Sequence, residues 1–368
     1  MDWPKELLEF HDEVRSVHLG PLWDVIHRII TREPDTAVEP YLWKWSVIKE
    51  QVLKSGELIT PERGGERRVI YLQNPGLDKK GIEAAATQTL YVGVQLLLPG
   101  EVAPSHRHAQ SAVRFIIEGD GAYTDVDGEK IYMERGDFIL TPAWTWHDHG
   151  HEGNEPMIWM DGLDSPFIQA LNASFFEPYP DKSQPLTRPS NYSVQRYGNG
   201  MLRPLGDRNE GYPSPLAVYQ WKHTKTALEN ISAFNADPFD GYAVEFINPA
   251  NGQSADPRIG SVMQKLPPNM HTKAHRHVSS AVYHVVEGSG YTVIDGVRFD
   301  WEKGDFFALP AWAWHEHVNA SADTDAMLFS INDAPLMELL ELQRTESFEE
   351  NEGFQEVKTV FEPLRLAR

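Results

Sequence analysis

A long internal repeat constrains what this chain can fold into more than any other feature. The segment 106–119 aligns with 275–288, and the segment 136–149 aligns with 304–317. The offset between the copies is 169 residues for the first pair of segments and 168 residues for the second. Two long segments that keep nearly one period indicate a duplicated domain. We therefore expect the 368 residues to contain two copies of the same fold.

Each copy predicts short antiparallel strands. Asp-Gly pairs at 127–128 and 295–296 lie between strand-like runs, and such a pair is the strongest short signal for a hairpin. Short strands separated by Gly and Pro favour an antiparallel barrel over a parallel sheet. Apolar residues at helical spacing occur near both ends of the chain. The predicted fold class is an all-β-dominated protein of two jelly-roll β-barrels, with peripheral helices at the N-terminus and after each barrel.

Composition divides the chain further. The segment before the second copy is rich in Pro, Ser, Asn and Arg, which is typical of a linker, and the last segment is acidic. We predict, in order, an N-terminal helical extension (1–60), an N-terminal barrel domain (61–177), a linker (178–215), a C-terminal barrel domain (216–345) and an acidic tail (346–368).

Charge and composition exclude several classes of function. The chain has 33 basic and 54 acidic side chains, a net charge of −21. This field repels nucleic acids and anionic membranes, so neither is an expected partner. The longest apolar run, around 90–99, is shorter than the ~20 residues of a membrane helix. Without cysteine and without a signal-peptide pattern, the chain reads as a cytoplasmic protein.

Histidines at strand spacing predict a metal site. His106 and His108 are two residues apart in a strand-like run, so both imidazoles point to one face. His147 follows another strand-like segment and can reach the same interior. Three imidazoles leave coordination positions open for a substrate. The spacing alone leaves open whether His147 or His149, two residues further on, is the third ligand. The second copy repeats the pattern with His275, His277, His315 and His317.

These spacings resemble the two motifs of the cupin superfamily, and both halves match, so the chain resembles a bicupin. Many cupins place a fourth ligand, a glutamate, where this chain has Ala112 and, in the second half, Ala281. That departure speaks against a manganese bicupin such as an oxalate decarboxylase. A site of three histidines and no carboxylate leaves the metal charge uncompensated, which favours anionic ligands from the substrate.

Over nearly its whole length the chain is similar to the gentisate 1,2-dioxygenase family, including its salicylate and 1-hydroxy-2-naphthoate dioxygenase relatives. The stretches that carry this resemblance include Trp43-Lys-Trp-Ser, Arg63-Gly-Gly-Glu-Arg-Arg, Asn74-Pro-Gly-Leu, Arg135-Gly-Asp and Asp161-Gly-Leu-Asp. The cupin motifs alone indicate only a fold, whereas these further stretches are specific to the family.

The resemblance implies one Fe(II) in a catalytic N-terminal cupin, held by His106, His108 and His147. It implies O2-dependent cleavage of gentisate between the carboxylated and the adjacent hydroxylated carbon, which gives maleylpyruvate. The alternatives are the same chemistry on salicylate or 1-hydroxy-2-naphthoate, or a non-catalytic metal-binding bicupin. The trio of the second half is a candidate for a second metal ion. The expected partners are a small aromatic acid and O2, in a homodimer or homotetramer.

Further residues are candidates for contacts with the substrate. Arg114 is six residues after His108 in one strand, so it points inward, where it pairs with a substrate carboxylate or with an internal acid. The second half has Tyr283 at this position, so it lacks the cationic group. His149 is a candidate for proton transfer or for orienting another group.

The remaining candidates are weighed against structural roles. Asp161 is predicted to orient a ligand or His149, because the second half has Ile331 at that position. Gln95 is a candidate for substrate binding or for barrel architecture, since Gln264 repeats it. Arg67 is predicted to contact the substrate or close the site, with surface salt bridges as the alternative.

Overall fold

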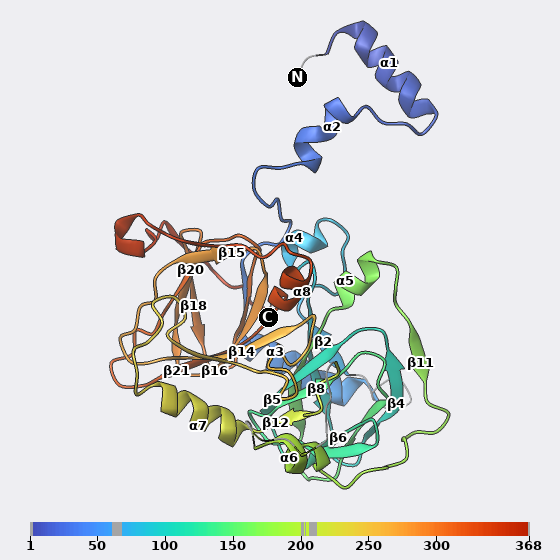
Figure 1. The fold of residues 1–368 in the computed structure, drawn as a ribbon, viewed down its shortest axis with the longest axis vertical. Helices are drawn as coiled ribbons and strands as arrows, with labels where there is room; N and C mark the ends of the chain where they lie inside the picture. Colours follow the sequence, from blue (N-terminus) through green and yellow to red (C-terminus); the bar gives the residue numbers. More distant parts are fainter. Residues whose placement is uncertain (1–2, 61–67, 200–201, 203, 206–211, 367–368) are drawn as a thin grey trace. The chain divides into compact units, whose positions relative to one another are not determined.

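The computed structural model describes residues 3–60, 68–199, 202, 204–205 and 212–366. The chain divides into a small unit, Met1–Thr36, and a large unit, Ala37–Arg368 (Figure 1). The small unit holds two helices, α1 (Lys5–Ser16) and α2 (Leu22–Ile29). Pro21 precedes α2, as expected for a residue that fixes the backbone at the start of a helix.

The N-terminal repeat folds into two antiparallel sheets of the large unit. Their strand orders are β12-β8-β5-β10-β3-β2 and β11-β4-β9-β6-β7. The strands are β2 (Val69–Tyr71), β3 (Tyr91–Leu97), β4 (Val102–His108), β5 (Ala112–Glu118), β6 (Ala122–Val126), β7 (Glu129–Tyr132), β8 (Phe138–Thr141), β9 (His147–His151), β10 (Met157–Leu163), β11 (Phe176–Pro178) and β12 (Val218–Tyr219).

The C-terminal repeat forms a second pair of sheets, with strand orders β1-β19-β16-β21-β14-β13 and β22-β15-β20-β17-β18-β23. All pairs are antiparallel except β18 with β23. The strands are β1 (Tyr41–Trp43), β13 (Tyr242–Glu245), β14 (Gly260–Leu266), β15 (His275–His277), β16 (Ala281–Glu287), β17 (Ser289–Ile294), β18 (Val297–Glu302), β19 (Phe306–Leu309), β20 (His315–Val318), β21 (Ala326–Asn332), β22 (Thr345–Ser347) and β23 (Thr359–Val360).

Helices lie at the edges of this β-structure. A short helix follows the last barrel strand of each copy, which are α5 after β10 and α8 after β21. The predicted fold class is therefore confirmed. None of the helices in the described part of the chain is long and apolar enough to cross a membrane. The helices of the large unit are α3 (Trp45–Leu58), α4 (Pro75–Asp78), α5 (Ser165–Ala170), α6 (Tyr192–Tyr197), α7 (Trp221–Ile231), α8 (Ala334–Leu339) and the 3₁₀ turn η3 (Asn351–Gly353).

The chain crosses between the two cupin domains twice, in equivalent ways. Strand β1 precedes the N-terminal cupin but pairs with β19 of the C-terminal cupin, and β12 pairs with β8 of the N-terminal cupin. The helix that follows each of these strands donates its first amide hydrogen to an aspartate of the cupin with which the strand pairs. The amide of Trp45 donates to Asp305 at 2.8 Å, and the amide of Trp221 donates to Asp137 at 2.9 Å. A carboxylate at a helix N-terminus is stabilising. The domain limits predicted above stay predictions and do not include these crossings.

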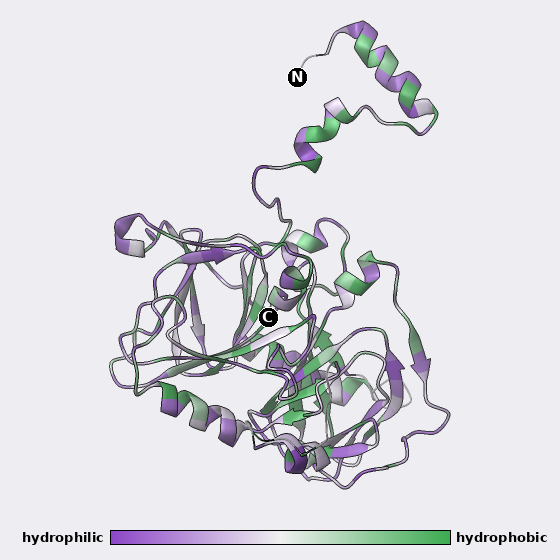
Figure 2. Ribbon diagram, in the orientation of Figure 1, coloured by the Kyte–Doolittle hydropathy of each residue, from purple (hydrophilic) through white to green (hydrophobic). Residues whose placement is uncertain are grey.

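A shared hydrophobic core joins the two cupins. Phe115 of β5 stacks on Phe329 of β21, with ring centres 4.4 Å apart and planes 15° apart. The same core contains side chains from both repeats, such as Phe138 and Met263. In Figure 2, β2 and β8 in the middle of the large unit are hydrophobic, whereas β4 and β11 are mostly hydrophilic. Burial of apolar side chains between the copies therefore ties the two domains into one unit.

The buried His284 makes the stability of this core depend on pH. Burial lowers the pKa of His284 to about 3, against an ordinary value of about 6.5. Below about pH 6.5 the unfolded chain therefore binds a proton that the folded chain excludes, and stability falls by about 1.4 kcal/mol per pH unit.

We predict that His284→Phe, which copies Phe115 at the equivalent position, removes this dependence. Urea unfolding should show the wild type losing roughly 1.5–2 kcal/mol more than the variant between about pH 6.5 and pH 5. A difference between the two proteins that stays constant with pH would contradict the prediction.

Candidate active site

Two neighbouring strands bring the first histidine trio together. His106 and His108 lie on β4, and His147 begins β9, where it pairs with His106 across the sheet. One nitrogen of each imidazole lies within 4.8 Å of the others. The alternation of side chains along β4 therefore places the two histidines on one face, as the sequence predicted. His149, the alternative third ligand, is not part of this cluster.

Backbone carbonyls fix which nitrogen of each imidazole is available. The Nδ1 atoms contact the carbonyl oxygens of Pro104 at 2.9 Å, of Gln110 at 2.9 Å and of Thr145 at 3.0 Å. A carbonyl only accepts hydrogen bonds, so each Nδ1 carries the hydrogen and each Nε2 keeps its lone pair. Three nitrogen ligand atoms within 4.8 Å of one another fit a divalent transition metal.

Electrostatics favour the neutral form of at least one of these histidines. Burial lowers the pKa of His147 well below its ordinary value, and the neighbouring His106 and His108 lower it further. A metal binds the neutral imidazole, so this shift keeps His147 in its ligand form at neutral pH.

A cavity of about 330 Å³ opens in front of the histidines. This is at the lower end of the roughly 300–1,000 Å³ typical of small-molecule sites. Ala112, at the position where many cupins have a glutamate, also borders the cavity. The structure brings together the sequence-predicted residues Gln95, His106, His108, Arg114, His147, His149 and Asp161 as its lining. Arg67, the remaining candidate of this site, lies outside the described residues.

Arg114 is paired with an internal acid, one of the two alternatives that the sequence left open. Its Nε donates to Asp161 Oδ1 at 2.8 Å, and Trp159 Nε1 donates to Asp161 Oδ2 at 2.8 Å. The guanidinium carbon lies 4.4 Å from the centre of the Trp159 ring, a cation–π distance. Asp161 therefore orients Arg114, and the remaining nitrogens of the guanidinium face the cavity side, toward His149.

The hydrogen bonds of His149 engage both of its ring nitrogens. Thr124 Oγ1 donates to the carbonyl of Asp148 at 3.1 Å, so it accepts from His149 Nδ1, which lies 2.9 Å away. With this hydrogen on Nδ1, Arg114 Nη2 donates to Nε2 of His149 at 3.1 Å. Arg114 Nη1 also lies 2.9 Å from Nδ1, where the other tautomer would accept from it. The hydrogen bond from Arg114 therefore occupies the lone pair with which Nε2 of His149 could accept a proton.

The cavity lining also includes residues that were not predicted, among them Tyr91, Gln110 and Phe176. Tyr91 lies on β3 four residues before Gln95, so strand alternation could have placed both on the same face. Burial raises the pKa of Tyr91, and nearby Asp161 raises it further, which keeps the phenol neutral. Gln110 follows the ligand strand, and Phe176 lies on β11 beside His108. Neither of these two residues has a periodic signal in the sequence.

The second trio has the same geometry in a different setting. One nitrogen from each of its histidines lies within 4.8 Å of the others. Tyr283 stands where the first half has Arg114, stacked on Phe307 with ring centres 4.7 Å apart, and burial raises the pKa of Tyr283. Gln264 donates to the carbonyl of Asp240 at 2.7 Å, whereas its counterpart Gln95 borders the cavity. The second trio, His275, His277 and His315, therefore has a neutral phenol in place of a guanidinium.

The fold and these two clusters define a bicupin, and the Cupin domain family matches residues 93–163 and 262–332. Gentisate 1,2 dioxygenase 1 of Aquipseudomonas alcaligenes is 44% identical over 89% of this chain and 93% of its own length. The 5-aminosalicylate 1,2-dioxygenase of Comamonas sp is 38% identical over 93% of this chain and 91% of its own. A crystal structure of salicylate 1,2-dioxygenase from Pseudaminobacter salicylatoxidans superposes with a TM-score of 0.87 at 34% identity, covering 94% of this chain and 99% of that one.

The chain belongs to the gentisate 1,2-dioxygenase family, and it is a ring-cleaving dioxygenase. The resemblance read from the sequence is thereby confirmed, as is the expectation of an oxidoreductase. The alternative of a non-catalytic bicupin is set aside.

We predict that each trio binds one divalent ion. His147→Ala should lower the metal content by one ion per chain and leave the ion of the other trio, and His315→Ala should do the reverse. Elemental analysis after anaerobic loading and gel filtration measures this, with the exposed His223→Ala as the control. A wild type that retains a single ion, lost only in His147→Ala, would restrict metal binding to the N-terminal cupin.

Proposed function

We propose that this enzyme uses Fe(II) to cleave gentisate between the carboxylated and the adjacent hydroxylated carbon, giving maleylpyruvate. The observation that carries the proposal is one cavity bordered both by three Nε2 lone pairs and by the Arg114 guanidinium. The chain has a net charge of −21, so an aromatic carboxylate needs such a local cation. The relative with 44% identity is named for gentisate.

The donor set supports iron at the N-terminal trio. His106, His108 and His147 would hold the ion as three neutral ligands from one side. Bound Fe(II) would supply the redox chemistry by which O2 attacks the aromatic ring. Ala112, which borders the cavity, has no side-chain atom that could act as a fourth ligand, so space is left for the substrate and O2.

In this proposal Arg114 binds the substrate carboxylate and His149 accepts the proton of the substrate hydroxyl. The Nη groups of Arg114 bind the carboxylate of the incoming acid, while Asp161 keeps Nε and thus the plane of the guanidinium fixed. When the carboxylate takes the Nη donors, Arg114 no longer donates to Nε2 of His149. That nitrogen is then available to accept the proton of the neighbouring hydroxyl. Gln95 and Arg67 stay candidates for further contacts with the acid.

The other proposals follow from the family and the composition. Salicylate and 1-hydroxy-2-naphthoate are the alternative substrates, and salicylate is favoured by the structural similarity to salicylate 1,2-dioxygenase. The cytoplasmic location, the homodimeric or homotetrameric state and the absence of nucleic-acid and membrane partners stay predictions.

Oxygen consumption tests the proposal directly. The protein is loaded with Fe(II) without air, and gentisate, salicylate or 1-hydroxy-2-naphthoate is added with air-saturated buffer. We expect uptake of one O2 per gentisate, a new absorbance from the ring-opened enol, and a product mass equal to gentisate plus O2. Turnover of salicylate without turnover of gentisate would move the substrate to that alternative. No uptake with any of the three acids would contradict the proposal.

We predict that Arg114→Ala weakens substrate binding rather than metal binding. A charged hydrogen bond contributes about 1.5–3 kcal/mol, so kcat/KM should fall by roughly 10- to 150-fold, mainly through KM. Steady-state kinetics and elemental analysis on the same sample measure both quantities. Arg114→Lys is the matched control, because it keeps the charge but loses the planar pair of donors. Loss of iron from Arg114→Ala would mean that the role of Arg114 is structural.

A further inference from the structure

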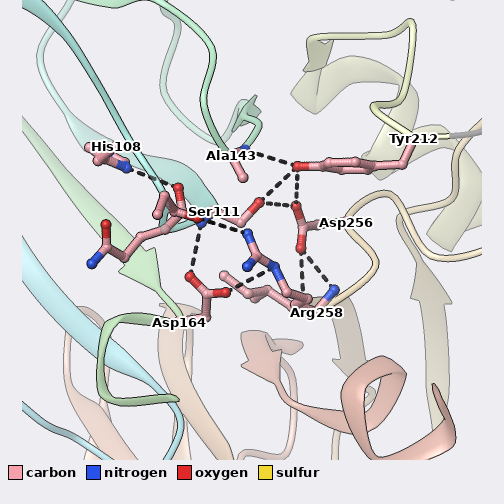
Figure 3. Close-up of polar contacts among 10 residues, drawn as sticks. His108, Ser111, Ala143, Asp164, Tyr212, Asp256 and Arg258 are labelled. Carbon is pink, nitrogen blue, oxygen red and sulfur yellow. Dashed lines mark hydrogen bonds and ion pairs between the residues drawn. The ribbon is translucent and has the colours of Figure 1, made fainter. Parts of the chain in front are cut away.

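A buried polar network connects the C-terminal cupin with the turn that follows His108 (Figure 3). Asp256 and Arg258 lie between β13 and β14, in the C-terminal half, and Ser111 and Asp164 belong to the N-terminal cupin. Ser111, Asp164 and Asp256 are at most 2% exposed. Groups so deeply buried need their partners, because an unpaired buried charge is strongly destabilising.

The contacts of this network are specific. Asp164 accepts from the Ser111 amide at 2.9 Å and forms an ion pair with Arg258 Nε at 2.9 Å. Arg258 Nη2 donates to the carbonyl of Ala109 at 3.3 Å. Asp256 Oδ2 accepts from the hydroxyl of Ser111 and, at 3.1 Å, from that of Tyr212. Residues from the C-terminal half thus hold both the backbone and the side chains of the turn 109–111.

This turn determines the orientation of one proposed metal ligand. The carbonyl of Gln110 accepts from His108 Nδ1, and the Gln110 side chain borders the cavity. The network also contacts the loop that precedes His147. Tyr212 accepts from the amide of Ala143, and Trp144 donates its amide to the carbonyl of His108 at 2.8 Å. One network therefore reaches the turn after His108 and the loop before His147.

The other half has the same network without the charges of Asp256 and Arg258. Ser280 and Asp333 repeat Ser111 and Asp164 at the offset of 169 residues, with the Ser280 amide donating to Asp333 at 2.7 Å. The residues that reach across from the other domain are Thr87 and Thr89, at the positions of Asp256 and Arg258. The version with Asp256 and Arg258 thus stands beside the trio with Arg114, and the version with two threonines stands beside the trio with Tyr283. Charge-assisted hydrogen bonds are roughly twice as strong as neutral ones.

We propose that Asp256 and Arg258 are positioning residues, through which the C-terminal cupin holds the metal ligands of the N-terminal cupin in place. The proposal rests on the metal-binding function proposed above. Removal of a group that orients a ligand typically weakens metal binding by about 10- to 100-fold.

Cobalt binding tests this proposal without relying on turnover. Co(II) is titrated into the full-length apoprotein carrying His275→Ala and His315→Ala, so that the visible absorption reports the N-terminal trio. Asp256→Thr and Arg258→Thr each introduce the residue that the other half has at that position, Thr87 or Thr89. We expect each variant to raise the apparent Kd for Co(II) by about 10- to 100-fold and to change the absorption spectrum. The matched control is Thr89→Val, which alters the network of the other half and should leave this Kd unchanged.

The outcomes separate positioning from stability and from the metal function itself. Urea unfolding of the same variants gives their loss of stability. Wild-type Kd and spectrum in Arg258→Thr, at any stability, would overturn the proposal. If Arg258→Thr does not fold, Tyr212→Phe removes a single hydroxyl, and a several-fold higher Kd is expected, whereas an unchanged Kd would overturn the proposal. Absence of Co(II) binding before these substitutions would instead contradict the proposed metal site.

Discussion

The hydrogen bonds from histidine Nδ1 atoms to backbone carbonyls are the interaction on which the rest of the site depends. They set the tautomer and the ring orientation of His106, His108 and His147 at once. Because the acceptors are main-chain atoms within two residues of each histidine, the site depends on the shape of the turns. Any contact that holds those turns therefore acts on the metal ligands. This is why a network that holds the turn 109–111, with residues from the other domain, bears on the chemistry.

Much of this site could be predicted from the sequence because strands impose a period of two. The spacing of His106 and His108 on β4 places both side chains inside the barrel. Arg114 also borders the cavity, but it lies on β5 and not on the strand of the histidines, so the predicted shared strand was wrong although the inward direction was right. The pattern could not decide between His147 and His149, since both positions share one face. That distinction comes from the turn geometry: His147 bonds to the carbonyl of Thr145, whereas His149 bonds to Thr124 across the sheet.

The crossings between domains were not predicted, and the reason is physical. Strands β1 and β12 have three and two residues, too short for a periodic signal, and their partners lie far away in sequence. The same holds for Asp256 and Arg258, which stand in a connecting segment where no pattern indicates burial. Whether Arg114 pairs with an acid or faces a substrate was also open, because inward direction does not identify a partner. Asp161, directly opposite Arg114 on β10, supplies that partner.

Duplication followed by divergence explains why two similar trios differ in their surroundings. Both halves keep the metal geometry, since it follows from the barrel itself. The two halves differ in the residues near the histidines. The N-terminal trio has Arg114 where the other has Tyr283. The residues that reach over from the other half are Asp256 and Arg258 in one case and Thr87 and Thr89 in the other. The proposed anionic substrate would bind in the half with the guanidinium, because the net charge of −21 repels anions elsewhere. The C-terminal cupin contributes side chains to the shared core and a hydrogen bond to the turn beside His108, which gives a structural reason for its presence. The C-terminal cupin therefore acts on the site of the N-terminal cupin through packing and hydrogen bonds.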